Sequence, residues 1–207
     1  MIGIVDVGGG MRCVYSAGIY DCFIDNNIVF PVCVGVSAGS ANLISYSCGQ
    51  RGRTYEFYTK YAARPEFMSM DNMRKTGSFI GLDYIYSDLS NSTGEYPLDY
   101  EHFVSSGVKL FVGATRACDG QAHFFTNSDI KQDDYSVLKA SCCIPAVCKA
   151  YSFGSVEYYD GGIASPIPFQ KAFDEGCDKV VVVLTKPREN YLIPFGKKVL
   201  TSIILHR

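Results

Sequence analysis

Hydrophobic positions near the amino terminus form two short uninterrupted runs on either side of one helical pattern. Residues 2–7 are a short apolar, β-branched run that stops at three glycines, residues 8–10, as is typical of a strand followed by a tight loop. Apolar residues then recur at helical spacing over residues 14–23. A second near-continuous apolar run over residues 29–36 is typical of a buried parallel strand. Together these segments predict a βαβ unit.

Further strands and a helix follow along the chain. The predicted strands cover residues 109–115, 123–126, 155–159 and 179–185, and residues 168–175 alternate like a helix between the last two. Strands that interleave with helices predict an α/β fold, a three-layer sandwich with a mostly parallel central sheet. A chain of 207 residues suits a single core, since one core can grow to roughly 250 residues before chains divide. We therefore expect one domain over residues 1–207.

Residues 54–100 interrupt this alternation. They are rich in Tyr, Phe, Met, Gly and Asn and lack a clean period, so we expect irregular helices and loops there. Such an aromatic segment can form the wall of a pocket for an acyl chain, although aromatic side chains also fill ordinary cores. Both interpretations stay open at the level of sequence.

Composition narrows the class of protein. A formal net charge of −2 without any run of Lys or Arg argues against nucleic-acid binding. The nine cysteines lack the spacing of a zinc ribbon or a redox pair, so we interpret them as small apolar core residues in a reducing cytosol. No run reaches about 18 apolar residues and the amino terminus lacks signal-peptide features. We expect a cytoplasmic protein.

The pentapeptide GVSAG, residues 35–39, follows the second apolar run and precedes a segment that can continue as a helix. This is the context of a nucleophile elbow, in which a strained strand-to-helix turn exposes a serine. Residues without a side chain are needed at Gly35 and Gly39, because strand and helix approach closely there. Ser37 is therefore the candidate nucleophile, although the pentapeptide alone also fits a plain tight turn.

A serine nucleophile needs a base to accept its proton. The chain holds three histidines, His102, His123 and His206. In the order serine, acid, histidine, only His206 at the extreme terminus remains available for a triad. The other candidate is Asp160, where a predicted strand ends before Gly161 and Gly162, two glycines that allow a sharp turn. A plain Asp-Gly turn would have the same sequence.

The glycine loop also suits acyl chemistry. Gly8, Gly9 and Gly10 lie between a predicted strand and helix, so they can present successive backbone N–H groups to an oxyanion without a Cβ in the way. A dinucleotide-binding loop is the competing interpretation. However, its GxGxxG pattern needs glycine where this chain has Cys13, and no acidic residue follows about twenty positions on at a strand end.

Together these three segments resemble the patatin-like phospholipase family, whose members carry a DGGGxRG motif, a GxSxG serine and a DG[GA] aspartate in that order. Here they read DVGGGMRC at residues 6–13, GVSAG at residues 35–39 and DGG at residues 160–162. The resemblance extends to Ala140-Ser141 with Pro145, to Pro166-Ile167-Pro168, and to Ala172 and Gly176. Val7 before the glycines and Cys13 after them depart from the pattern without removing a catalytic group.

The resemblance implies a dyad without histidine, in which Ser37 attacks the ester and Asp160 accepts its proton. It places the oxyanion hole at Gly8, Gly9, Gly10 and Met11, with Arg12, Gly35, Gly39, Gly161 and Gly162 in support. The substrates would be lipid or acyl esters, reached by peripheral contact with a membrane surface. Because nucleophile, base and oxyanion donors all come from the chain, we expect no metal or organic cofactor.

Other functions remain open. The same fold can serve as a catalytically silent protein that binds a lipid or acyl ligand, or as a thioesterase or acyl transferase, since a dyad does not fix the leaving group. The chain ends in an apolar helical pattern over residues 197–207 without a stop signal. Members of the family often continue beyond this point, so we expect a domain that is truncated at its carboxyl end.

Overall fold

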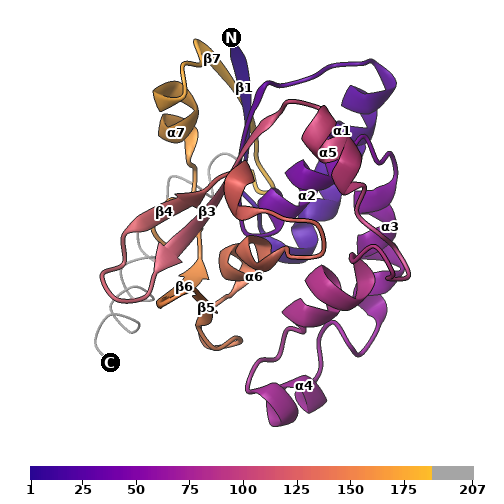
Figure 1. The fold of residues 1–207 in the computed structure, drawn as a ribbon, viewed down its shortest axis with the longest axis vertical. Helices are drawn as coiled ribbons and strands as arrows, with labels where there is room; N and C mark the ends of the chain where they lie inside the picture. Colours follow the sequence, from indigo (N-terminus) through magenta and orange to yellow (C-terminus); the bar gives the residue numbers. More distant parts are fainter. Residues whose placement is uncertain (188–207) are drawn as a thin grey trace.

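One mixed sheet forms the centre of the computed structural model, which describes residues 1–187 (Figure 1). Its strands are β1 (Ile2–Asp6), β2 (Val32–Val36), β3 (Lys109–Arg116), β4 (Ala122–Phe125), β5 (Tyr151–Phe153), β6 (Val156–Asp160) and β7 (Lys179–Val183). The strand order is β5-β6-β3-β2-β1-β7, with β4 also paired to β3. Strands β7, β1, β2 and β3 pair in parallel, whereas β4, β5 and β6 join through antiparallel pairs.

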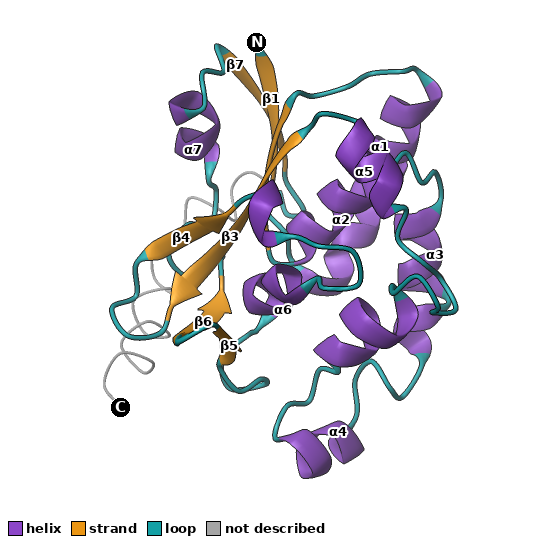
Figure 2. Ribbon diagram, in the orientation of Figure 1, coloured by secondary structure: helices purple, strands orange, loops and turns teal. Residues whose placement is uncertain are grey.

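Helices cover both faces of this sheet (Figure 2). The α-helices are α1 (Val14–Asp25), α2 (Ala38–Ser47), α3 (Arg53–Thr59), α4 (Met70–Thr76), α5 (Tyr100–Ser105), α6 (Ser136–Cys142) and α7 (Phe169–Asp174). Short 3₁₀ helices span Gly10–Cys13, Tyr61–Ala63 and Asn127–Asp129, and a π-helix spans Tyr84–Leu89. Helix α7 lies on one face of the sheet and the other α-helices lie on the opposite side (Figures 1 and 2).

Successive side chains of a strand point to opposite faces of the sheet. Because helices cover both faces, the side chains of the central strands enter two separate hydrophobic cores. In β1, Ile4 joins the larger core, whereas Val5 joins the smaller core beneath α7. In β2, Cys33 and Val34 divide in the same way. This arrangement confirms the predicted α/β sandwich with helices on both faces.

Most predicted elements are present, with shifted ends. The predicted strand over residues 29–36 begins only at Val32, because Val29 is exposed and Pro31 has no N–H for a sheet hydrogen bond. Helix α6 and strand β5 were not predicted, since such short elements show little periodicity. Residues 54–100 form short helices and loops, as expected.

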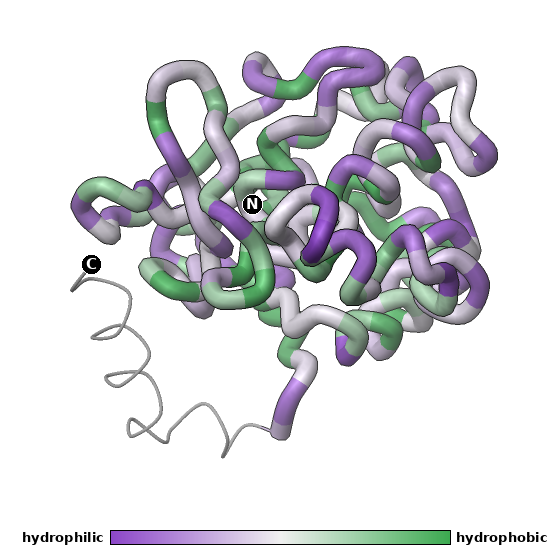
Figure 3. The backbone as a smooth tube through the Cα atoms, turned by 90° about the horizontal axis from the view of Figure 1, so that it is seen from below, coloured by the Kyte–Doolittle hydropathy of each residue, from purple (hydrophilic) through white to green (hydrophobic). Residues whose placement is uncertain are grey.

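The cysteines and the hydropathy pattern also agree with expectation. Seven of the nine cysteines are buried, and all nine are free thiols. Hydrophobic and hydrophilic stretches alternate along the described chain (Figure 3). No helix within residues 1–187 is long and apolar enough to cross a membrane. The pattern over residues 197–207 lies outside the described residues.

Candidate active site

Ser37 lies at the sharp turn between β2 and α2. Its backbone has φ 56° and ψ −141°, a conformation that non-glycine residues adopt only under strain. The turn needs small neighbours: a Cβ on Gly35 would lie 2.5 Å from the Ser40 Cα, and one on Gly39 would lie 2.5 Å from the Asp6 carbonyl oxygen. These contacts give both glycines of the GxSxG pentapeptide the steric role expected of them.

The sheet brings Asp160 to the same place, although 123 positions separate it from Ser37 (160 − 37). Strand β6 runs antiparallel to β3 and pairs only with its end, so that Asp160 lies opposite Ala114. The neighbouring Gly113 pairs with Val36, the residue before Ser37. The last residue of β6 therefore lies at the level of the nucleophile turn.

Gly161 allows this close approach. A Cβ at this position would lie 2.1 Å from the Gly113 carbonyl oxygen and 3.0 Å from Val36 Cγ1. Gly162 follows with its N–H directed back at Asp160 Oδ1, 2.8 Å away. In the DGG sequence, the first glycine is therefore required because a side chain would clash there, and the second donates a hydrogen bond to Asp160.

The Asp160 carboxyl is almost completely buried. Burial raises its pKa from 3.8 to about 6, and the nearby Ser37 hydroxyl and the Gly162 N–H partly oppose this rise. No closed hydrogen bond joins the two side chains, and Asp160 Oδ2 has no partner within residues 1–187. Contacts between catalytic groups are often long without substrate. The free oxygen beside the serine is therefore an available proton acceptor.

Ser141, at the end of α6, connects the segments that carry both residues. Its Oγ accepts a hydrogen bond from the Ser37 N–H at 2.9 Å and donates one to the Gly113 carbonyl oxygen at 2.6 Å. Its own carbonyl oxygen accepts from the Gly161 N–H at 3.2 Å. Sequence reasoning noted Ser141 only through the family resemblance. Because the Ser37 N–H is engaged, it is not available to an oxyanion.

The glycine loop lies beside this turn, and all three glycines have positive φ: 68° at Gly8, 136° at Gly9 and 60° at Gly10. Gly8 was expected among the oxyanion donors, but its N–H donates to Asp6 Oδ1 at 2.9 Å. Gly10 and Met11 begin a 3₁₀ helix, and the first N–H groups of a helix have no partner within it. The amides of Gly9, Gly10 and Met11 remain candidates for binding an oxyanion.

The side chain of Asp6 stabilises this loop through a hydrogen bond to the Gly8 N–H. It is fully buried and accepts hydrogen bonds from the Gly8 N–H, the Tyr20 hydroxyl at 2.8 Å and the Asn42 amide at 3.4 Å. Burial raises its pKa, while these bonds oppose the shift. Arg12 lies on the outside, where its Nε is 3.8 Å from the Cβ position of Gly9. An acidic residue at the end of an apolar strand was the signal for Asp6, and sequence reasoning did not use it.

The histidines do not complete a triad within residues 1–187. His123 packs against the rings of Phe125 and Tyr158, and burial lowers its pKa. His102 lies in α5, where its ring is next to Gly49. His206 lies outside the described residues. None of the hydrogen bonds found in the described part of the chain joins His102 or His123 to Ser37.

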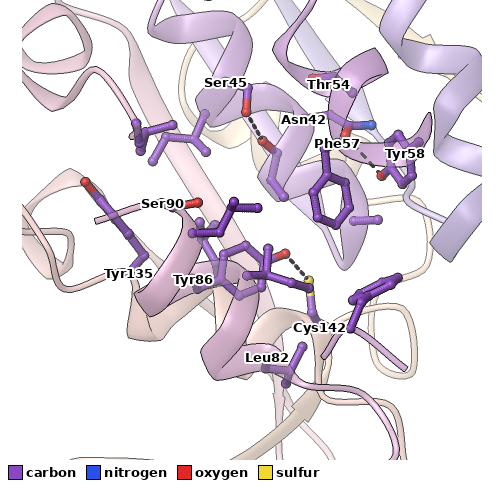
Figure 4. A pocket seen from close by; sticks show the side chains of 18 of the residues that line it. Asn42, Ser45, Thr54, Phe57, Tyr58, Leu82, Tyr86, Ser90, Tyr135 and Cys142 are labelled. Atoms are coloured by element: carbon purple, nitrogen blue, oxygen red, sulfur yellow. Dashed lines mark hydrogen bonds between the residues drawn. The ribbon is translucent and has the colours of Figure 1, made fainter. Parts of the chain in front are cut away.

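A large, mainly apolar pocket opens at Ser37. Its cavity volume is about 100 Å³, several times the ~10–15 Å³ that a single water needs on the same measure, so an organic group fits. Its lining residues are Gly10, Ser37, Ala38, Ala41, Asn42, Ile44, Ser45, Arg53, Thr54, Phe57, Tyr58, Phe67, Ile80, Leu82, Ile85, Tyr86, Leu89, Ser90, Tyr96, Leu98, Tyr135, Leu138, Cys142 and Ile144. Half of these belong to the irregular segment over residues 54–100, and the aromatic rings of Phe57, Tyr58 and Tyr86 are seen in Figure 4.

The aromatic segment therefore has both functions that its sequence left open. Tyr61 is a buried side chain outside the pocket lining, whereas Phe57 and Tyr86 form pocket wall. No group of three or more His, Cys, Asp or Glu side chains within residues 1–187 is arranged to hold a metal ion.

The chain is similar to known proteins in sequence and in fold. The model of the family described as patatin-like phospholipase matches residues 7–173. The chain is 29% identical over 198 residues to the uncharacterized protein YjjU of Escherichia coli (strain K12). The aligned region covers 93% of this chain and 54% of YjjU. The crystal structure of VipD from Legionella pneumophila has the same fold, with a TM-score of 0.53 and 14% identity over 92% of this chain and 51% of VipD. The chain thus spans about half the length of these relatives.

Proposed function

Since the chain belongs to the patatin-like phospholipase family, we propose that it is a serine hydrolase that cleaves carboxylic ester bonds of lipids through Ser37 and Asp160. Family membership supports lipid acyl hydrolysis as the general class of activity. The observation that carries the finer proposal is the free oxygen of a buried carboxyl beside a serine in a strained turn. A structural aspartate in a core would have that oxygen bonded.

The proposed reaction needs only groups of this chain. Asp160 accepts the proton of Ser37 as Oγ attacks the ester carbonyl carbon, and the amides of Gly9, Gly10 and Met11 stabilise the negative oxygen. The C–O bond to the alcohol then breaks, and Asp160 gives its proton to the leaving oxygen. Water attacks the acyl-enzyme with Asp160 again as base, which releases the acid and restores the serine.

Asp160 has a suitable proton affinity for this exchange. An ordinary aspartate, with a pKa of 3.8, would be a weak base at neutral pH, whereas burial raises the pKa of Asp160 to about 6. The carboxyl is thus mostly ionised at pH 7 yet holds a proton more readily than an exposed one. The apolar pocket beside it suits the acyl chain of the substrate.

A catalytically silent lipid-binding protein and a thioesterase or acyl transferase are the alternatives. We propose one experiment for all of them: reaction with a fluorophosphonate probe, followed by a panel of p-nitrophenyl esters, lysophospholipids and acyl-CoA thioesters. The hydrolase is supported if the substitution Ser37→Ala abolishes labelling and if EDTA does not affect ester turnover. Binding of lipid without labelling identifies the silent protein, and preferential thioester turnover identifies the thioesterase.

We also propose that the protein acts in the cytoplasm, at the surface of a membrane that supplies its substrate. The absence of paired cysteines and the apolar pocket support this placement. Cell fractionation with a tagged full-length chain tests it directly.

A further inference from the structure

One end of the pocket holds a buried cation. Arg53, the first residue of α3, is only 6% exposed and lines the pocket. Within residues 1–187 no carboxylate forms an ion pair with it. The pKa of Glu56 is lowered mainly by hydrogen bonds with Tyr96 and Lys60, and the charge of Arg53 contributes least. A desolvated guanidinium without a counter-ion is unusual and calls for a reason.

The bonds that Arg53 makes are all to neutral acceptors. Its Nη1 donates to the carbonyl oxygens of Tyr96 and Pro97, both at 2.7 Å, and Nη2 donates to Ser90 Oγ at 3.0 Å. The guanidinium also lies over the Tyr96 ring, 4.6 Å from its centroid. Arginine carries five N–H donors, so Nε and one hydrogen of Nη2 have no acceptor within residues 1–187. Burial lowers the pKa of Arg53.

A second unsatisfied polar group lies nearby. Tyr135 is one of the pocket-lining residues, and its hydroxyl is buried without a hydrogen-bond partner among the described residues. Burial raises the pKa of Tyr135. The tyrosine O–H therefore has no hydrogen-bond acceptor among the described residues. In Figure 4, Ser90 and Tyr135 lie on one side of the pocket, apart from Phe57 and Tyr58.

This polar end is remote from the nucleophile. The pocket follows one face of α2, from Ala38 through Ala41 to Ser45, and eight residues of helix after Ser37 advance about 12 Å. Gln50, just beyond α2, donates to the same Pro97 carbonyl oxygen as Arg53, at 3.0 Å. The guanidinium thus lies at the far end of α2. The wall between the two ends is mainly apolar, with Asn42, Ser45 and Thr54 as polar members.

We propose that Arg53, Ser90 and Tyr135 bind a carboxylate at the end of the acyl chain remote from the ester, so that the pocket selects acyl esters of dicarboxylic type. A chain of about ten bonds spans about 12 Å, since three backbone bonds advance about 3.5 Å. The phosphate of a lipid headgroup is separated from the ester by only a few atoms and does not reach this end. A carboxylate there converts a lone buried charge into a charge-assisted pair with the spare N–H groups.

This inference rests on the proposed function for its reaction, but its binding step can be measured without catalysis. Binding is measured by calorimetry to Ser37→Ala with two probes, decanedioic acid mono-amide and decanamide, which differ in the terminal carboxylate. With Arg53 and Tyr135 intact, the affinity for the carboxylate probe should exceed that for decanamide by about tenfold or more, which is the contribution of one charge-assisted hydrogen bond. Equal affinities would overturn the inference and leave the proposed function untouched.

Matched variants separate charge from structure. Arg53→Met and Arg53→Lys both lose the forked bonds to Tyr96 and Pro97, but only lysine keeps the charge; we expect the preference to vanish with methionine and to persist in part with lysine. Tyr135→Phe removes a hydroxyl that has no partner, so the fold should tolerate it, and the preference should fall severalfold. Tyr100→Phe, outside the pocket, is the control. A preference that survives both Arg53→Met and Tyr135→Phe contradicts the proposal.

Turnover distinguishes the two hypotheses. With the wild-type chain, p-nitrophenyl esters of decanoate and of decanedioate mono-acid are compared by kcat/KM. Hydrolysis of neither ester, with the binding preference intact, refutes the proposed hydrolase and supports the carboxylate site. Hydrolysis of both at equal rates refutes the carboxylate site and supports the hydrolase.

Discussion

The Ser141 hydroxyl accepts a hydrogen bond from the Ser37 N–H at 2.9 Å and donates one to the Gly113 carbonyl oxygen at 2.6 Å. The strained turn that carries the candidate nucleophile is thereby held by a side chain 104 positions away. Catalytic geometry at this turn depends on packing between α6 and the sheet as much as on the GxSxG sequence.

Ser141→Ala tests this dependence. The substitution leaves the buried N–H of Ser37 without an acceptor, so we expect a loss of about 1–3 kcal/mol in the free energy of unfolding and a fall of kcat by one to two orders of magnitude. Urea denaturation and ester kinetics measure the two effects. Ser47→Ala removes an ordinary bond to the Leu43 carbonyl oxygen within α2, away from the pocket lining, and is the control. Normal kcat in Ser141→Ala would show that the turn holds its shape unaided.

Ser37→Ala should abolish ester hydrolysis and fluorophosphonate labelling while circular dichroism stays unchanged. Removing one member of a catalytic unit can lower the rate by roughly 10⁶. The smaller side chain also fits the turn, because within residues 1–187 no geometric hydrogen bond of the Ser37 hydroxyl joins it to another segment. Activity within tenfold of the parent contradicts the assignment of Ser37 as nucleophile.

Asp160 should set the pH dependence of turnover. Because the carboxyl must be ionised to accept a proton, and its pKa is raised to about 6, kcat/KM should rise with pH and reach half its plateau near pH 6. Asp160→Asn should lose nearly all activity while the Gly162 N–H keeps its acceptor. A profile with its midpoint near pH 4, or an active asparagine variant, would exclude Asp160 as the base.

The same carboxyl should lower stability at neutral pH. A group whose pKa is 3.8 in the unfolded chain and about 6 in the folded one binds more protons when folded, so its contribution to stability falls as pH rises from about 4 to 6. Asp160→Asn should thus be more stable than the parent at pH 8, by up to about 3 kcal/mol for a shift of two pKa units. The difference should disappear near pH 4. Urea unfolding at both pH values measures it, and a variant less stable at pH 8 contradicts the expectation.

Two glycine substitutions should have opposite effects. A Cβ on Gly39 would lie 2.5 Å from the Asp6 carbonyl oxygen and 2.6 Å from its Oδ1, so Gly39→Ala should destabilise the fold by about 1–3 kcal/mol or more and reduce labelling of Ser37. Gly18 lies exposed in α1 with nothing near its Cβ position, so Gly18→Ala should stabilise by about 0.5–1 kcal/mol. Thermal unfolding of both variants provides the comparison.

Local sequence carried much of the fold and the position of the nucleophile turn. The apolar runs predicted β1 and β2, and small residues around Ser37 predicted the turn, because close packing and strain act within a few residues there. Asp160 was placed at the end of a strand. What sequence did not indicate was that β6 runs antiparallel and pairs only with the end of β3, since strand direction and register depend on contacts between distant residues.

The same limit explains the details of the oxyanion loop. Glycine content predicted that the loop presents N–H groups, but the buried carboxylate of Asp6 takes the one from Gly8. Ser141 and Arg53 likewise act through partners far away in the sequence. Residue type reveals which groups can form such bonds, and the tertiary fold decides which of them are left free for substrate.

The glycine loop is also held by the last part of the described chain. The Thr185 hydroxyl donates to the Gly8 carbonyl oxygen at 2.5 Å, across 177 positions, and β7 must pair with β1 to bring it there. During synthesis, therefore, the nucleophile turn and the glycine loop emerge from the ribosome long before the strand that fixes them. A nascent chain cannot have its glycine loop fully supported until it has been made past Thr185, so the order of translation leaves this loop incompletely held until the sheet is complete.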